Sequence, residues 1–181
     1  MTSTPATFYT IGHSNRPLEE FLRLLAAVEI ATVVDVRKIP QSRAHPQFGR
    51  PALEASLTAA GRGYVHMPVL GGRRGVLREV APELNGWWKI ASFHNFADYA
   101  LTAEFRDGLA QLQALGHAAR CALMCSEAVW WRCHRRIIAD HLLNEGECVV
   151  HILGAGRQEP ASLSDGARRD SHGRLTYPAL V

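Results

Sequence analysis

A cluster of reactive and cationic residues lies in segment 121–143, CALMCSEAVWWRCHRRIIADHLL. Cys125 ends an apolar run, Glu127 follows it closely, and a helical pattern begins near Cys133. A cysteine at a strand end that faces a helix N-terminus can have a depressed pKa and act as a thiolate nucleophile. Cysteine is also among the most frequently buried residues, so a packing role for Cys125 stays open. Glu127 is a candidate general base, with the alternative that it orders a neighbouring arginine.

The same segment offers groups that could bind an anion or shape a pocket. Arg135, near the expected helix start, could hold a phosphate or carboxylate through a bidentate contact. Cys133 and His134 would form part of the pocket wall. A zinc site of Cys125, Cys133 and His134 is disfavoured, because structural zinc sites use closely spaced cysteine pairs and adjacent helical residues project about 100° apart. We therefore expect no metal and no other cofactor.

Strand-like and helix-like segments alternate along the chain and predict how these residues are positioned. Short β-rich or apolar runs predict strands at 8–12, 32–36, 64–68, 121–125 and 148–153. Amphipathic patterns predict helices at 16–29, 51–61, 96–116 (one or two helices) and 133–146. This alternation predicts an α/β three-layer sandwich, with a central, mostly parallel sheet of about five strands covered by helices on both faces. We expect one domain over 8–153 and a C-terminal tail over 154–181 that could add one edge strand.

In such sheets, ligands bind outside the carboxyl ends of the strands. The first two predicted strands deliver polar or charged residues to that edge: His13, Ser14, Asp35, Arg37, Ser42 and Arg43. Asp35 is an acid–base candidate, with the alternative that it caps the strand or pairs with Arg37. The other five are candidates for substrate binding, whereas His66 and His151 are expected to be packed or surface histidines. The hypothesis requires the segments around residues 13, 35 and 125 to line a single crevice.

Composition narrows the class of function. The 181 residues are 47% hydrophobic and 20% charged, as is typical of a domain with a buried core. The net charge of +3 does not indicate general coating of nucleic acid, but basic loops at 37–50 and 71–78 would attract an anionic ligand unless they are merely solvated. There is no apolar run of roughly 20 residues and no signal-peptide pattern. The cysteine spacing is unlike that of a small secreted domain, so we expect reduced thiols in a cytoplasmic protein.

Several segments resemble, in order, the bacterial family called domain of unknown function 488. They are TIGHSNRPLEEFLRLL, VVDVRKIPQSRAHPQF, GYVHMPVLGG, FADYALTAEFRDGLAQL, ALMCSEAVWWRCHRRIIADHL and VVHIL. The resemblance covers about residues 8–153 and implies a compact cytoplasmic α/β domain without an established general activity. The recurring positions of the family correspond here to Gly12, His13, Ser14, Asp35, Arg37, Pro40, Ser42, Arg43, Gly71, Gly72, Cys125, Glu127, Cys133, His134 and Arg135. The chain departs from the family at Ser126, where alanine is usual, and at 129–131, where the family has a more polar link.

A weaker similarity is to rhodaneses, which also combine an Asp-Val-Arg strand end with a cysteine after a later strand. Their loop, like that of cysteine phosphatases, places an arginine five or six residues after the cysteine, usually with a glycine between. Here Arg132 stands seven positions after Cys125 and no glycine intervenes, which disfavours sulfur transfer and phosphoester hydrolysis by a covalent cysteine. A reversible disulfide between Cys125 and Cys133 is a separate redox alternative.

The leading hypothesis is an enzyme that acts on an anionic substrate such as a nucleotide, a nucleic acid or a phosphorylated metabolite. Asp35 and Glu127 would act as acid–base groups and Cys125 as the nucleophile. The alternative is a regulatory module that binds a ligand or nucleic acid without turnover. The expected partner is a small anionic ligand or nucleic acid and not a membrane, and the sequence assigns no oligomeric state.

Overall fold

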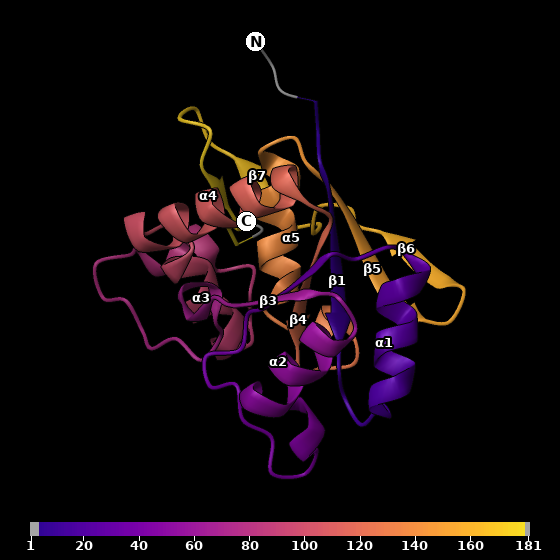
Figure 1. Ribbon diagram of the computed structural model, residues 1–181. Coiled ribbons are helices and arrows are strands. Elements are labelled where there is room, and N and C mark those ends of the chain that lie inside the picture. The colour runs from indigo at the N-terminus through magenta and orange to yellow at the C-terminus, as the bar shows by residue number, and fades with distance from the viewer. Residues whose placement is uncertain (1–3, 180–181) are drawn as a thin grey trace.

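A six-stranded sheet forms the middle layer of the protein, with the strand order β3-β2-β4-β1-β5-β6 (Figure 1). The computed structural model describes residues 4–179. Five strands run parallel: β1 (Thr7–Gly12), β2 (Thr32–Asp35), β3 (Gly63–His66), β4 (Cys121–Cys125) and β5 (Cys148–Gly154). A sixth, β6 (Arg157–Pro160), pairs antiparallel with β5 at the edge. The expected α/β fold with a mostly parallel sheet is confirmed, and the extra strand comes from the segment predicted as a tail.

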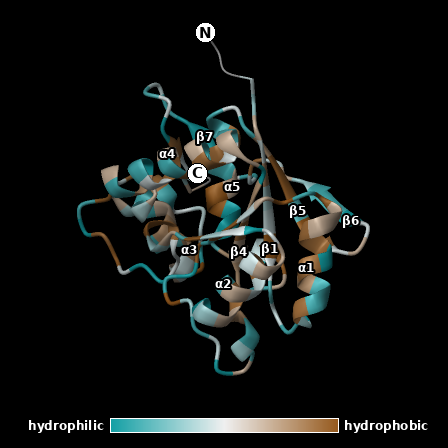
Figure 2. Cartoon of the chain, viewed as in Figure 1, coloured by the Kyte–Doolittle hydropathy of each residue, from teal (hydrophilic) through white to brown (hydrophobic). Residues whose placement is uncertain are grey.

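Helices cover both faces of the sheet and create two hydrophobic clusters. They are α1 (Leu18–Ala27), α2 (Arg50–Ala59), α3 (Ala91–Tyr99), α4 (Ala103–Ala118) and α5 (Arg135–Asn144). Val33 packs in the cluster with α1 and α2, whereas Val34 packs in the other with α3, α4 and α5. Successive strand residues alternate between faces, so both faces need apolar side chains. The helices in Figure 2 accordingly carry both hydrophobic and hydrophilic residues.

The region predicted as one or two helices at 96–116 contains two. Thr102 separates α3 from α4, and its side-chain oxygen accepts a hydrogen bond from the backbone N–H of Phe105 at 3.2 Å. Gly108 lies inside α4 and does not interrupt it. A Cβ atom there would lie 2.7 Å from a methyl group of Val69, so this glycine allows close packing of α4 on the segment after β3.

The segment after β5 packs onto the same core. Besides β6 it contains β7 (Arg168–Arg169) and β8 (Leu175–Thr176), which form a separate two-stranded sheet. Tyr177 is fully buried, and its hydroxyl donates a hydrogen bond to Asp140 of α5 at 2.9 Å. The chain thus returns to α5 after leaving the main sheet. No helix between residues 4 and 179 is both long and apolar enough to cross a membrane.

His151 lies on β5 and is packed inside the protein, which is one of the two placements expected for it from the sequence. A 2.7 Å hydrogen bond joins its Nδ1 to the Thr10 hydroxyl, and its ring stacks on Trp130 with 4.4 Å between centroids. Burial, together with the positive charge of Arg135, lowers the pKa of His151 to about 3. The imidazole is therefore a neutral part of the core at physiological pH.

This burial predicts a loss of stability in acid. The unfolded chain binds a proton at His151 below its ordinary pKa of 6.5, whereas the folded chain binds one only near pH 3, so the free energy of unfolding falls as the pH is lowered through this interval. We expect His151→Gln to remove this contribution, which is at most about 1.4 kcal/mol per pH unit. Urea unfolding at several pH values measures it, with His172→Gln at an exposed position as the control. An unchanged pH dependence in His151→Gln would contradict the assignment.

Candidate functional site

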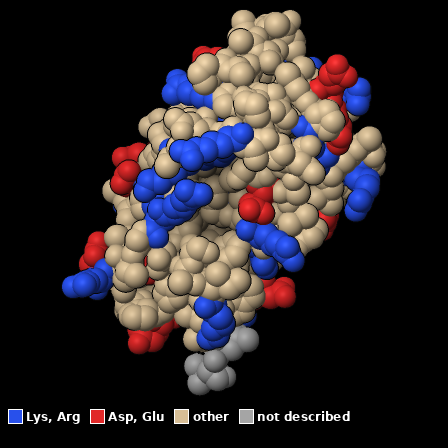
Figure 3. Space-filling view, turned by 90° about the horizontal axis from the view of Figure 1, so that it is seen from below, with Lys and Arg blue, Asp and Glu red and all other residues tan. Residues whose placement is uncertain are grey.

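A cavity of about 340 Å³ lies at the carboxyl edge of the sheet, where β2 and β4 end. Figure 3 shows a hollow on this face with lysine and arginine side chains beside it. Five of the residues predicted for the site line the cavity: Arg37, Cys125, Glu127, Cys133 and His134. The backbone N–H of His13 donates to the Cys125 carbonyl at 2.9 Å, and a 3.3 Å contact joins His13 Nε2 to Arg37 Nη1. The segments around residues 13, 35 and 125 therefore lie next to one another, but only the segments after 35 and around 125 line the cavity.

Arg37 is held at the cavity by a buried carboxylate. Its Nε and Nη2 donate to the two oxygens of Asp35 at 2.9 and 2.6 Å, and the Tyr64 hydroxyl donates to Asp35 Oδ2 at 2.7 Å. Burial alone would lower the pKa of Arg37, but the hydrogen bonds and charge of Asp35 raise it overall. Burial and the bond to Asp35 also raise the pKa of Tyr64, which stays a donor. Asp35 is fully buried and is not among the residues that line the cavity, so its observed contacts position Arg37.

His13 supports Arg37 from a second side. Its Nδ1 donates to the Ser14 carbonyl at 2.9 Å, because a carbonyl oxygen can only accept, and this leaves Nε2 to accept from Arg37. The ring stacks on Phe48 with 4.4 Å between centroids. Burial lowers the pKa of His13 to about 4, so the imidazole is neutral at physiological pH. His13 lies behind the cavity wall and orients the guanidinium.

The remaining candidates for substrate binding do not line the cavity. Ser14 donates its backbone N–H to the Ser126 carbonyl at 3.0 Å, and the hydroxyl of Ser42 accepts from the His45 N–H at 3.1 Å. Arg43 is exposed on the loop after β2. Arg135 is 1% exposed, and its Nη2 donates to the Glu127 carbonyl at 2.6 Å. The donors of Arg135 therefore connect the exit of β4 to the start of α5.

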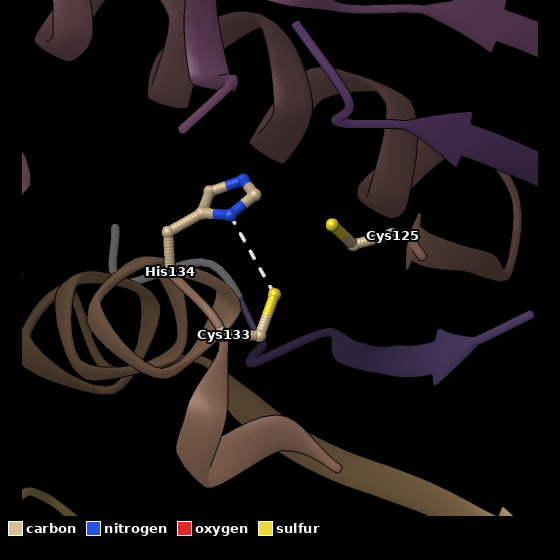
Figure 4. A group of neighbouring side chains, drawn as sticks. All are labelled: Cys125, Cys133 and His134. Atoms are coloured by element: carbon tan, nitrogen blue, oxygen red, sulfur yellow. Dashed lines mark hydrogen bonds between the residues drawn. The ribbon is translucent and has the colours of Figure 1, made fainter. Parts of the chain in front are cut away.

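The two cysteines of the cavity form a close pair with unequal acidity. Arg135 Nε donates to the sulfur of Cys133 at 3.2 Å, and a 3.5 Å hydrogen bond joins this sulfur to His134 Nδ1 (Figure 4). Burial raises the pKa of Cys133, but hydrogen bonding from Cys125 and the charge of Arg135 outweigh it and lower that pKa to about 6. The same contact with Cys133, together with burial, raises the pKa of Cys125 to about 12. Cys133 is therefore the more acidic of the two thiols.

Lysine and arginine side chains that were not assigned individually from the sequence complete the rim. Lys38, Arg73 and Arg132 are exposed and line the cavity, and Lys38 Nζ donates to the Arg73 carbonyl at 3.3 Å. Lys38 and Arg73 lie in the two basic loops that the sequence marked for anion attraction. Arg132 lies in a short 3₁₀ turn before α5, Trp130–Arg132. Among the described residues that line the cavity, Glu127 is the single acid.

The start of α3 also contributes to the wall. Ser92 and Phe93 line the cavity, and the Phe93 ring stacks on Trp88 with 4.9 Å between centroids. No chemical signal in the sequence points to these two positions, because a serine and a phenylalanine in an amphipathic helix are equally compatible with packing.

Gly12 allows the loop after β4 to cross directly over the end of β1. A Cβ atom on Gly12 would lie 1.8 Å from the carbonyl oxygen of Glu127. This carbonyl is the acceptor for Arg135. The missing side chain therefore fixes how closely the Glu127 segment approaches the sheet.

One family model matches the chain. It is described as domain of unknown function DUF488 and covers residues 17–142. No match to a curated protein or to a solved structure was found.

The buried ion pair of Asp35 and Arg37 predicts how the stability of the protein changes when one or both residues are replaced. Asp35→Asn leaves Arg37 charged and buried without its partner, and we expect it to lower the free energy of unfolding by about 3 kcal/mol or more. The double variant Asp35→Asn/Arg37→Met removes the uncompensated charge and should recover part of this loss. Urea unfolding of the three proteins tests the pattern. A free energy of unfolding of Asp35→Asn within about 0.5 kcal/mol of the wild-type value would show that the buried Arg37 does not depend on Asp35.

The contact at Gly12 predicts that Gly12→Ala is destabilising by about 1–3 kcal/mol, because the added methyl group overlaps backbone atoms that must shift. Gly154→Ala is the matched control, since a Cβ atom there meets nothing within 4 Å. Thermal or urea unfolding of both variants provides the comparison. Equal stabilities would show that the loop does not depend on this close approach.

Proposed function

This chain belongs to the family described as domain of unknown function DUF488, and from the geometry of its site we propose that it is an enzyme that binds an anionic substrate at the carboxyl edge of the sheet. The substrate class is a nucleotide or another small phosphorylated metabolite. A cytoplasmic setting is part of the proposal, supported by four cysteines that are all free thiols.

The charge of the cavity is the observation that carries this proposal. Four of its lining residues are lysine or arginine, and Glu127 is the one acid among those that the structure describes. Three cationic side chains, those of Lys38, Arg73 and Arg132, are exposed at the rim. Such a concentration of one sign of charge around a concave surface attracts anions and raises their local concentration. An anionic substrate therefore fits the site better than a neutral or cationic one.

Arg37 gives the cavity a preorganised anion-binding group. Three of its side-chain N–H donors are used by Asp35 and His13, and the remaining donors are available to a ligand. Because its contacts hold the guanidinium in one orientation, little side-chain entropy is lost when a ligand binds. A guanidinium of this kind suits the bidentate recognition of a phosphate or carboxylate.

Glu127 is the acid–base candidate of the proposed reaction. It lies two residues after the end of β4 and lines the cavity among cations, whereas Asp35 is occupied by Arg37 and Tyr64. A carboxylate beside bound substrate is placed to accept or donate a proton in the reaction. We assign Asp35 to positioning Arg37 and Glu127 to proton transfer.

The anion-binding part of the proposal is tested with inorganic phosphate and a panel of nucleotides. We expect saturable binding by calorimetry and at least about a tenfold loss of affinity in Arg73→Ala/Arg132→Ala, because two charges of the rim are removed. Arg23→Ala, at an exposed position of α1, is the matched control and should bind like the wild type. Absence of binding to every anion, or equal binding by the double variant, would refute the proposal.

The catalytic part is tested separately with Glu127→Gln. For an enzyme, this variant should retain ligand binding while losing turnover of the nucleotide or phosphorylated metabolite that binds. A non-catalytic regulatory module would show binding without turnover in the wild type as well. A nucleic-acid-binding module would instead be retained on single-stranded DNA and released steeply by salt.

A further inference from the structure

Two sulfur atoms and an imidazole at the floor of the cavity have the arrangement of a metal site. The ligand atoms of Cys125, Cys133 and His134 all lie within 4.8 Å of one another. Figure 4 shows the two sulfurs and the imidazole facing a common space between the end of β4 and the start of α5. All three residues line the cavity.

The spacing of these atoms fits tetrahedral coordination. Bonds of about 2.3 Å to sulfur and about 2.0 Å to nitrogen place tetrahedral ligand atoms about 3.5–3.8 Å apart. The sulfur of Cys133 lies 3.5 Å from His134 Nδ1. Since the whole group spans no more than 4.8 Å, a shift of about 1 Å or less would complete the geometry.

The hydrogen bonding of His134 places the lone pair of the ring on the nitrogen that faces the sulfur atoms. Its Nε2 lies 3.1 Å from the Val36 carbonyl, and because a carbonyl oxygen only accepts, Nε2 carries the proton. The lone pair of the neutral ring is then on Nδ1, the nitrogen that faces Cys133. Metal-ligating histidines characteristically donate their other ring N–H to a carbonyl or carboxylate in this way.

Neighbouring residues hold the ring without blocking it. Phe96 packs edge-on against the imidazole with 5.0 Å between centroids. Gly72 lies beside Nδ1, and a Cβ atom at that position would lie 3.0 Å from this nitrogen. Arg135 Nε donates to the sulfur of Cys133 at 3.2 Å, a contact that stabilises a thiolate ligand.

We propose that Cys125, Cys133 and His134 bind Zn²⁺, with the fourth coordination position facing the cavity. Two thiolates balance the charge of a divalent ion, and a sulfur–imidazole donor set suits zinc. Three protein ligands with one open position are typical of catalytic zinc, whose fourth ligand is a water molecule or a substrate atom. Glu127 lies on the same cavity wall. The site is defined by its own ligand atoms and does not depend on anion binding at the rim.

The expectation of no metal rested on spacing and on a helical geometry that the structure does not have. Cys133 has φ −130° and ψ 147°, so it is extended and lies outside α5, and His134 occupies the N-cap position. The two adjacent side chains are therefore not separated as they would be within a helix, and both reach the end of β4.

The test uses the full chain, stripped of metal under reducing conditions and titrated with Co²⁺ as a spectroscopic substitute for Zn²⁺. We expect a thiolate-to-cobalt charge-transfer band and the intense visible bands of tetrahedral Co²⁺, saturating at one ion per chain and lost on adding Zn²⁺. Cys125→Ser and Cys133→Ser should lose the charge-transfer intensity in part or entirely. Cys148→Ser removes an exposed cysteine that is not among the residues lining the cavity, and it should leave the spectrum unchanged. No such bands in the wild type, or unchanged bands in Cys133→Ser, would overturn the proposal.

A second measurement needs no variant and covers the case in which the serine substitutions do not fold. Zn²⁺ should slow alkylation of Cys125 and Cys133 in the wild type, detected by mass spectrometry of the labelled peptides, while labelling of Cys148 is unaffected. Equal labelling with and without Zn²⁺, or a Cys125–Cys133 disulfide that forms on mild oxidation regardless of Zn²⁺, would contradict metal binding and favour thiol redox chemistry.

The two proposals can fail independently. Arg73→Ala/Arg132→Ala should lose phosphate affinity but retain the Co²⁺ spectrum, because neither arginine contributes a ligand atom. Loss of the Co²⁺ spectrum in this double variant would count against a site formed by the three ligands alone.

Discussion

The buried ion pair between Asp35 and Arg37 is the interaction on which the arrangement of the cavity depends. The carboxylate has no exposed surface and the arginine is 5% exposed, so each charge needs the other. Asp35 is placed by the end of β2, and Tyr64 on the neighbouring strand completes its hydrogen bonds. The sheet therefore fixes the position of the Asp35 carboxylate, and the ion pair in turn holds the Arg37 guanidinium at the cavity. His13 extends the same network to β1.

The loops around this ion pair contain residues with strained backbone conformations. Ser14 and Arg73 have φ values of 46° and 60°, in the left-handed region that non-glycine residues seldom occupy. Each such residue costs about 1–2 kcal/mol of conformational free energy. Ser14 lies in the loop after β1 and Arg73 lines the cavity, so two of the three non-glycine residues with positive φ among those described lie next to the proposed site. The third, Glu29, lies in the connection between α1 and β2.

The sequence was sufficient for features that depend on local pattern. Continuous apolar runs located β4 and β5, and the alternation of strand-like and helix-like segments identified the parallel sheet and its carboxyl edge. The pairing of Asp35 with Arg37 was foreseen as an alternative, since the two residues lie two positions apart at a strand end. The cationic character of the rim followed from two basic loops.

Features that depend on contacts between distant segments could not be predicted from the sequence. No local pattern indicates that Tyr177 reaches Asp140, because one aromatic residue in a short segment near a proline is compatible with many positions. The closeness of Cys125, Cys133 and His134 depends on extended backbone at Cys133, whereas the amino-acid pattern favoured a helix there. The individual rim residues likewise depend on how the loops fold back over the sheet.

The burial of Tyr177 against α5 has a consequence for the order in which the protein matures on the ribosome. α5 follows directly on the segment that contains Cys133 and His134, yet its packing against Tyr177 cannot form until translation has passed that tyrosine. A nascent chain that has exposed only the first five strands thus has α5 without one of its aromatic contacts. The chemical groups at the start of this helix would reach their final rigidity late in biosynthesis.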